Sequence, residues 1–463
     1  MKMANFKVYG NLKLERSLLK TRNKIRSKFR EVTITIYLIL HLVIIFILGD
    51  STAFAPDEND YVDAFKQIYS TKYNNEQLAG WGSEKSIYLK IIYSPAWILN
   101  NITKDELLAI RLYSTILVTI ALYLILKLIN RQYLKSILKN ILLTMIFFMP
   151  SLLIWGSLAL RESFIYFFLV LIYFSLTKII EKKNFKQNYI LLFIGAYGLL
   201  LTKSYLFMIL LISYVAYILR NKKQVREFKI VSIILVLPLL TNPILFQQIK
   251  GNLQYYLKDN NGNVISSAIS ATTSPIQPTP STSPDLSLSL GRTSIELRNQ
   301  IEFNARLKLF LQKIPIIENV FSSSQLLRDE TSLKIRTWIP PRFNDFEGIL
   351  QASLRVLFLP MPFKDNGSFF LNLLTIEWPI WIGLYLLAFV NFYSARKCLD
   401  TSGFIVKISR NFSLLLLLQS IFFEINMGTN YRHRTVLLLI VLLADISIFR
   451  LKNNRFQKIQ EST

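Results

Sequence analysis

Residues 150–174 read PSLLIWGSLALRESFIYFFLVLIYF, and this stretch decides the fold class. Two apolar runs, 140–158 and 163–180, meet around the adjacent charges Arg161 and Glu162. A helix needs about 20 mostly apolar residues to cross the hydrocarbon core of a bilayer. The stretch therefore predicts two membrane helices joined by a tight polar turn.

Similar apolar runs recur along the whole chain of 463 residues, of which 52% are hydrophobic. We count ten of them: 33–49, 107–129, 140–158, 163–180, 189–201, 204–219, 229–246, 372–393, 411–424 and 435–449. A water-soluble core of this length would not need so much apolar surface. We expect an all-α polytopic membrane protein with about ten transmembrane helices and two outer-face loop regions.

The formal charge of +25 is distributed on one side of this predicted topology. With the N-terminus inside, the whole excess falls on the cytoplasmic segments 1–32, 127–139, 178–187, 220–229, 394–410 and 450–463. This is the positive-inside pattern, so the charge is explained without nucleic acid as a partner. We expect a multi-pass protein of the inner (plasma) membrane with both termini cytoplasmic. The single cysteine, Cys398, excludes an intramolecular disulfide and a cysteine metal site.

Two long outer stretches divide the chain into a basic N-terminus (1–32), a membrane domain (33–246), an outer loop (247–371), C-terminal transmembrane helices (372–449) and a cytoplasmic tail (450–463). The first outer stretch, 50–106, contains PDENDYVDAFKQIY, in which Val62, Phe65, Ile68 and Tyr69 follow a helical spacing. We expect an amphipathic helix on the outer membrane surface. The Ser, Thr and Pro-rich tract 266–290 of the second stretch predicts disorder.

A small set of charged residues falls at helix ends on the outer side. Its members are Asp57, Glu58, Arg161, Glu162, Lys203, Arg432, His433 and Arg434. A charge drawn toward the bilayer centre costs roughly 2.5 to 3.5 kcal/mol on insertion scales. Lys203 is notable on this criterion, because it separates two short apolar runs. We therefore treat the set as candidate functional residues.

Each candidate also has an ordinary structural role. Asp57 and Glu58 follow Pro56, so they fit the first turn of a helix. Arg161 and Glu162 fit an exposed surface pair, and Lys203 fits a side chain that reaches the headgroups. The cluster 432–434 fits a membrane anchor, although its positive charge on the outer side opposes the orientation signal.

Taken together, carboxylates and cations at one membrane face suit the transfer of a sugar from a lipid-linked phosphate. A carboxylate can take the proton from the acceptor hydroxyl, and cations can hold the phosphate as it leaves with negative charge. Arginine binds two phosphate oxygens at once, while lysine acts as a point charge. An inverting displacement needs one base, as in an inverting glycosidase. No nucleotide-binding glycine loop follows a predicted strand.

The order of these features resembles the GT-C membrane glycosyltransferases, in particular the protein mannosyltransferases and lipid A aminoarabinose transferases. The similarity covers about 33–246 and lies in PDE (56–58), AIRLYSTILVTIALYLI (109–125), PSLLIWGSLALRESFIYFFLVLIYF (150–174) and LLLTKSYLFMILLISYVAYIL (199–219). LRVLFLPMPF (354–363) and NYRHR (430–434) resemble bacterial polysaccharide-associated members more loosely.

The resemblance implies a polyprenyl-phosphate sugar donor and a glycan, lipid or protein acceptor on the outer face. It places Asp57 with Glu58 on the family's acidic motif near the catalytic centre and Lys203 on its LTK motif. Our own hypothesis is that Asp57 or Glu58 is the general base and that Arg432, Arg434 and Lys203 bind the donor phosphate. Arg161 with Glu162 orients the site, and Tyr431 and His433 complete the predicted substrate-binding set. The long low-complexity insertion departs from the family and leaves the acceptor open. No metal-ligand cluster is evident, so we expect no cofactor and leave metal dependence open.

Two other readings fit the same residues. A polysaccharide polymerase or ligase would use the outer arginines on a preassembled lipid-linked glycan, with a wide groove built from 247–371. A transporter or a non-catalytic membrane scaffold would also carry charges among its helices. Transporters commonly show paired repeats and broken helices in both halves, and no such repeat is visible in the sequence.

Overall fold

The computed structural model describes residues 31–46, 56–69, 82–129, 137–181, 185–220, 229–240, 346–358, 375–395, 403–423 and 432–448. The chain divides into two compact units, one made of Met1–Pro238 with Asn319–Thr463 and the other of Leu239–Glu318. All contacts given below lie within the first unit. The predicted disordered tract 266–290, the predicted cytoplasmic tail 450–463 and all but the last two residues of the predicted N-terminal segment 1–32 lie outside the described residues.

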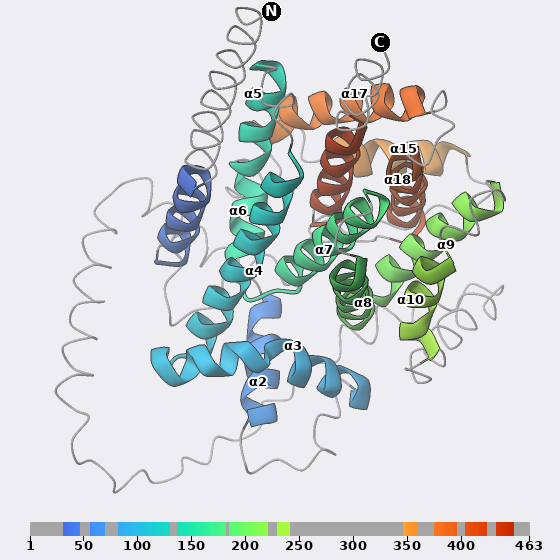
Figure 1. Cartoon of the computed structure of the whole chain (residues 1–463). Coiled ribbons are helices and arrows are strands. Elements are labelled where there is room, and N and C mark those ends of the chain that lie inside the picture. Colours follow the sequence, from blue (N-terminus) through green and yellow to red (C-terminus); the bar gives the residue numbers. More distant parts are fainter. Residues whose placement is uncertain are drawn as a thin grey trace, which may run out of the picture. The chain divides into compact units, whose positions relative to one another are not determined.

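The described residues form helices and contain no β-strand, which confirms the all-α class for this part of the chain (Figure 1). In chain order they are Glu31–Phe46, α2 (Pro56–Tyr69), α3 (Gly82–Thr103), α4 (Glu106–Leu128), α5 (Ile137–Phe147), α6 (Pro150–Ser157), α7 (Glu162–Ile180), α8 (Phe185–Thr202), α9 (Ser204–Arg220), α10 (Lys229–Leu240), α15 (Phe346–Phe358), the 3₁₀ turn η3 (Thr375–Glu377), α17 (Trp378–Ala395), α18 (Phe404–Phe423) and a final helix, 432–448. Each of the ten predicted runs overlaps at least one of these helices.

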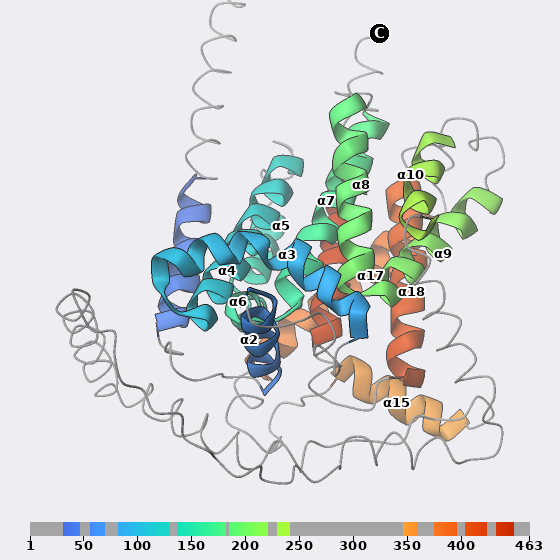
Figure 2. The same ribbon diagram turned by 90° about the horizontal axis from the view of Figure 1, so that it is seen from below.

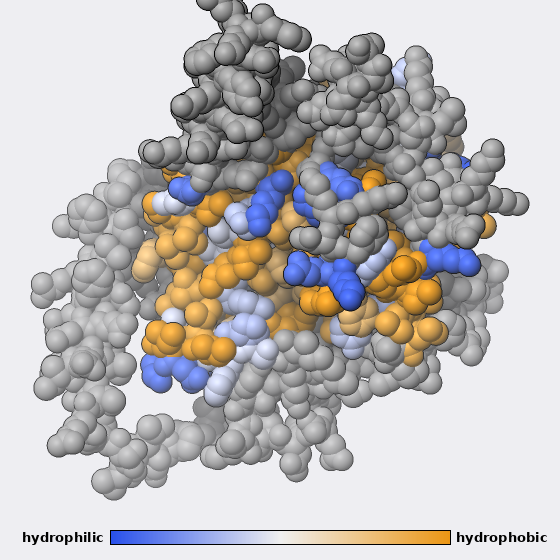
Figure 3. Space-filling view, viewed as in Figure 1, coloured by the Kyte–Doolittle hydropathy of each residue, from blue (hydrophilic) through white to orange (hydrophobic). Residues whose placement is uncertain are grey.

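Five described helical segments are long and apolar enough to cross a membrane, which is the pattern of a helical membrane protein. They are Glu106–Leu128, Lys139–Ser157, Glu162–Ile180, Thr375–Tyr393 and Phe404–Phe422. Hydrophobic side chains make up much of the described surface in the space-filling view (Figure 3). The ten crossings and the orientation of the termini stay predictions.

Helix α7 forms the centre of the packing, because it contacts α4 on one side and α8 on another. Two glycines let α8 approach it closely. A Cβ atom added at Gly198 would lie 2.2 Å from Cε1 of Phe168, and one added at Gly195 would lie 2.8 Å from Cγ1 of Ile172. Small residues at helix interfaces are typical of membrane bundles, where association depends on close van der Waals packing.

Helix α3 is a second helix within 50–106, where the sequence analysis expected only one. Its pattern is interrupted by Pro95, which lies inside the helix, and it ends before Lys104, whose φ of 56° is in the left-handed region. Asp105 then begins α4, accepting a hydrogen bond at 2.7 Å from the backbone N–H of Leu108. The chain therefore turns sharply between α3 and α4, and the two helices pack together.

Helix α2 confirms the predicted helical spacing, but its apolar face lies against protein. Tyr61, Val62 and Phe65 are buried, and the rings of Tyr61 and Phe65 contact that of Tyr93 in α3. The side chains of Ile68 and Tyr69 lie outside the described residues. Packing on α3 and α4 thus replaces the membrane-surface contact expected for the buried part of this face.

The predicted run 140–158 is broken in the structure into α5 and α6. Pro150 stands at the first position of α6, where its missing N–H costs little. The N-terminal helix Glu31–Phe46 contacts the end of α6, since Nδ1 of His41 lies 2.5 Å from Oγ of Ser157. The break makes α6 a short separate helix, and the site described next is built around its two ends.

Candidate functional site

The candidate residues that the structure describes gather at one end of the helices, where several helix termini meet. Arg161 and Glu162 form the junction between α6 and α7, and Lys203 lies between α8 and α9. The final helix begins beside both junctions, because Arg432 lies 3.8 Å from Glu162 and His433 contacts Tyr205 of α9. Residues separated by more than two hundred positions in the sequence are thereby brought together.

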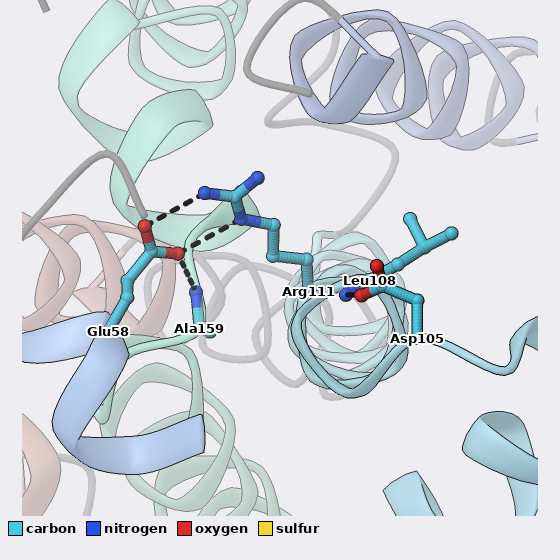
Figure 4. Close-up of polar contacts among 5 residues, drawn as sticks. All are labelled: Glu58, Asp105, Leu108, Arg111 and Ala159. Atoms are coloured by element: carbon cyan, nitrogen blue, oxygen red, sulfur yellow. Dashed lines mark hydrogen bonds and ion pairs between the residues drawn. The ribbon is translucent and has the colours of Figure 1, made fainter. Parts of the chain in front are cut away.

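Glu58 is held by two hydrogen bonds from one arginine and one from the backbone (Figure 4). Nε of Arg111 donates to Oε1 at 3.0 Å, and Nη2 donates to Oε2 at 2.9 Å. The backbone N–H of Ala159, in the turn after α6, donates to the same Oε1 at 2.7 Å. Glu58 and Arg111 are both fully buried, so the pair ties α2 to α4 and to the α6–α7 turn.

This geometry gives Glu58 a clear positioning role, because both of its carboxylate oxygens accept hydrogen bonds within a buried site. Asp57 precedes it in the first turn of α2, and the side chain of Asp57 lies outside the described residues. Arg161 follows two residues after Ala159, and its guanidinium lies 5.9 Å from the ring centre of Tyr61 in α2. The start of α2 is therefore fixed beside the α6–α7 turn.

Arg432 rests on an aromatic face. Its guanidinium carbon lies 4.9 Å from the ring centre of Trp155 in α6, within the range of a cation–π contact. Its charge is balanced by Glu162, which is almost buried. Thr435, one turn further, donates to the carbonyl oxygen of Arg432 at 2.6 Å and also contacts the hydroxyl of Tyr166 in α7. These contacts fix the first turn of the final helix against α6 and α7.

His433 and Lys203 meet at Tyr205. The Tyr205 hydroxyl lies 2.5 Å from Nε2 of His433, and Nζ of Lys203 lies 5.3 Å from the centre of the Tyr205 ring. Lys203 stands between two helices, and its backbone N–H donates to the carbonyl of Leu199 at 2.8 Å. The break places this cation at helix ends, where it can reach polar surroundings.

Arg434 contacts a tryptophan that is hydrogen-bonded to a second buried carboxylate, Glu377. Its guanidinium lies 4.4 Å from the ring centre of Trp381, whose Nε1 donates to Oε2 of Glu377 at 3.3 Å. Oε1 of Glu377 accepts a hydrogen bond of 2.5 Å from the backbone N–H of Ser151, in the first turn of α6. A carboxylate there satisfies an orphan N–H and complements the helix dipole.

Both ends of α6 are thus held by carboxylates from distant parts of the chain. Glu377 binds the N-terminal turn at Ser151, and Glu58 binds the turn after the C-terminus at Ala159. Trp155 lies between these two points, and its ring contacts the guanidinium of Arg432. The short helix therefore acts as a fixed support for the cationic face of the site.

Sequence reasoning found most of the cations but missed their buried partners. The missed partners are the buried Trp155, Glu377 and Trp381 and the partly buried Tyr205, together with Arg111, the buried partner of Glu58. Arg111 had a usable signal, because it is a charge inside the predicted membrane run 107–129, the same criterion that singled out Lys203. Tyr431 lies outside the described residues.

The described part of the chain contains no group of three or more His, Cys, Asp or Glu that could hold a metal ion. What the site offers is a set of cations beside carboxylates in surroundings of low polarity, where electrostatic interactions are stronger than in water. Such a set can bind an anionic group and orient a proton acceptor next to it.

Comparison with known proteins finds no family model, no curated protein and no solved structure that matches this chain. The functional argument therefore depends on the residues and contacts described above.

Proposed function

We propose that this protein is a membrane glycosyltransferase that moves a sugar from a polyprenyl-phosphate donor to a cell-envelope glycan, lipid or protein acceptor. The observation that carries the proposal is the convergence of Arg432, His433 and Lys203 with Glu162 at one end of the helices. Three cationic or potentially cationic side chains at this position favour an anionic substrate group whose carrier is itself in the membrane.

The cations suit a phosphate that becomes a leaving group. In the proposed reaction the acceptor oxygen attacks the anomeric carbon, the bond from that carbon to the phosphate oxygen breaks, and the electron pair stays on the phosphate. Arg432 presents a planar fork for two phosphate oxygens, and Lys203 supplies a point charge. The stacking of Arg432 on Trp155 supports this role, because it orients the guanidinium before substrate arrives.

Asp57 is the proposed general base, which accepts the proton of the acceptor hydroxyl. Glu58 is the positioning residue beside it, since Arg111 and Ala159 bind its two oxygens. The division follows from geometry, because both oxygens of Glu58 already accept hydrogen bonds within a buried site. Arg161 and Glu162 orient the site between them.

The proposed site faces the outer side of the inner (plasma) membrane, with both termini cytoplasmic. This orientation rests on the positive-inside pattern of the sequence, in which the basic segments fall opposite the helix ends that carry the site. A donor with a long lipid tail would reach such a site from within the bilayer.

The proposal is tested by the surface-glycan profile, measured by mass spectrometry in a strain that lacks the gene. The strain is complemented with the wild type, with Asp57→Asn, or with Asp63→Asn at matched abundance. Asp63 is exposed on the same helix and serves as the matched control. We expect one sugar to disappear on deletion, and to return with the wild type and Asp63→Asn but not with Asp57→Asn.

Other outcomes separate the competing functions. A shift in glycan chain length with unchanged composition would indicate a polymerase or ligase. Full restoration by Asp57→Asn would show that the carboxylate only starts a helix, and would remove the proposed base.

A further inference from the structure

We propose that α15 lies along the membrane–water interface, with Phe346, Leu350 and Leu354 inserted among the lipids. These three side chains are 80%, 51% and 45% exposed and follow one another at intervals of four residues. They therefore form one stripe along the helix. The inference is independent of the proposed glycosyl transfer.

The opposite face of α15 is covered by protein. Ala352 and Val356 are buried with Ile421 of α18, and Ile349 packs against the same cluster with Leu417 and Phe422. The exposed stripe is thus not the face by which the helix attaches to the bundle. A second apolar face on an already docked helix needs a second apolar environment.

On one side of the helix, a polar face separates the two apolar ones. Gln351 donates to Glu347 at 3.2 Å, and Nη2 of Arg355 donates to Oε1 of Gln351 at 3.4 Å, so these side chains form a ladder along the helix. At about 100° per residue, this ladder directly adjoins the stripe of Phe346, Leu350 and Leu354. A helix with lipid and water on neighbouring faces is the pattern of one that lies in the interfacial plane.

The length of α15 excludes a crossing. Its 13 residues extend about 20 Å at 1.5 Å per residue, while the hydrocarbon core is about 30 Å thick. The helix also runs steeply across α18, which is long and apolar enough to span (Figures 1 and 2). With α18 taken as a spanning helix, α15 would lie closer to the membrane plane than to its normal.

Two features make lipid the occupant in preference to another protein. Leu414 and Leu418 of α18 are also exposed, on the helix whose Phe422 packs on the docked face of α15, so both packed helices present apolar side chains outward. At its C-terminal end α15 is tied to α17, since the hydroxyl of Tyr385 donates to the carbonyl of Leu357 at 2.8 Å. Phe358 also meets Trp378 there, and aromatic residues are enriched at membrane interfaces.

The test uses spin labels on single cysteines in the full chain. Because Cys398 is the only native cysteine, Cys398→Ser gives a clean background. Leu350→Cys and Leu354→Cys place labels on the stripe, and Glu347→Cys and Gln351→Cys place matched labels on the polar face. In proteoliposomes, power saturation measures how often each spin label collides with oxygen, which partitions into lipid, and with a nickel chelate, which stays in water.

We expect the ratio of oxygen collisions to nickel-chelate collisions to be at least about threefold higher for labels at 350 and 354 than for labels at 347 and 351. The labels at 350 and 354 should lie at a depth of about 5 to 10 Å in the membrane. Equal nickel access at all four positions would place the stripe in water and overturn the proposal. Low access to both reagents at 350 and 354 would show a protein partner or a second copy on the stripe. A depth near the bilayer centre would also overturn it. An elution profile in gel filtration that matches the unlabelled protein confirms that each labelled variant has folded.

Discussion

Arg111 of α4 and Glu58 of α2 form a fully buried ion pair in which two nitrogens of one residue meet two oxygens of the other. Loss of one partner from a buried pair leaves an uncompensated charge, which costs about 3 to 5 kcal/mol. We therefore expect Arg111→Ala to lower the free energy of unfolding by about that amount. Denaturant unfolding in detergent micelles, followed by circular dichroism, measures the change.

The exposed Lys127, at the other end of α4, provides the control for this change. Lys127→Ala should alter stability by less than about 1 kcal/mol, because exposed charges contribute little. Combining Arg111→Ala with Glu58→Ala should recover part of the loss, since the orphan charge is removed as well. A double variant as unstable as the sum of its two single variants would argue against a coupled pair.

The stacking of Arg432 on Trp155 predicts a kinetic effect for a conservative change. Arg432→Lys keeps the positive charge but loses the planar fork and the aromatic contact at 4.9 Å. Under the proposed function, KM for the polyprenyl-phosphate donor should rise about tenfold, equal to about 1.4 kcal/mol, with protein abundance unchanged. The measurement is a transfer assay on purified protein in lipid. The control is Arg220→Lys, at an exposed site at the end of α9, which should leave KM unchanged. An equal rise of KM in the two variants would refute a specific role of Arg432 in donor binding.

The close approach of α7 and α8 predicts opposite results for two Gly to Ala changes. At Gly198 a new Cβ would meet the ring of Phe168 at 2.2 Å, so Gly198→Ala should destabilise the protein by about 1 to 3 kcal/mol. Gly383 in α17 has no atom within 4 Å of a new Cβ, so Gly383→Ala should be neutral or slightly stabilising. Thermal unfolding in detergent compares the two. Equal melting temperatures would show that the helices are further apart than described.

Lys139 of α5 binds Asp445 of the final helix through both carboxylate oxygens, at 2.5 and 2.7 Å. Asp445 is buried, and Asn391 of α17 also donates to it at 3.3 Å. Lys139→Met should cost about 1.5 to 3 kcal/mol, because a buried carboxylate loses its charged donor. Adding Asp445→Asn should restore much of that loss, as measured by the same unfolding assay. No rescue would show that Lys139 acts through packing alone.

The helices themselves could be predicted from the sequence because length and apolar composition are local properties. The runs around 107–129 and 163–180 coincide with α4 and α7 to within one residue at each end. Helix α3 was missed because Pro95 and several polar residues interrupt its pattern, and its formation depends on packing against α4. Tertiary contact, not periodicity, decides such a segment.

The sequence could predict which types of residue form the site, but not which of them contact one another. A single sequence shows that Arg432 and Glu162 are unusual for a membrane protein, yet it contains no information that they lie 3.8 Å apart. The same holds for Glu377 and Ser151, which are joined across 226 positions by one hydrogen bond. The functional interpretation of these residues stays a prediction, and the variants above are its tests.

The final helix, 432–448, carries charged groups near both of its ends, and these charges bear on its predicted insertion into the membrane. Arg432 and Arg434 contact α6, α7 and α17, while Asp445, about 20 Å further along the helix axis, contacts α5 and α17. Every one of these partners is synthesised earlier. On its own the segment would enter lipid with charges unmatched, at a cost of up to about 3 kcal/mol for each. The predicted entry of this helix into the bilayer would thus depend on the helices made before it, and glycosylation mapping should show poor insertion of the isolated segment and efficient insertion in the full chain.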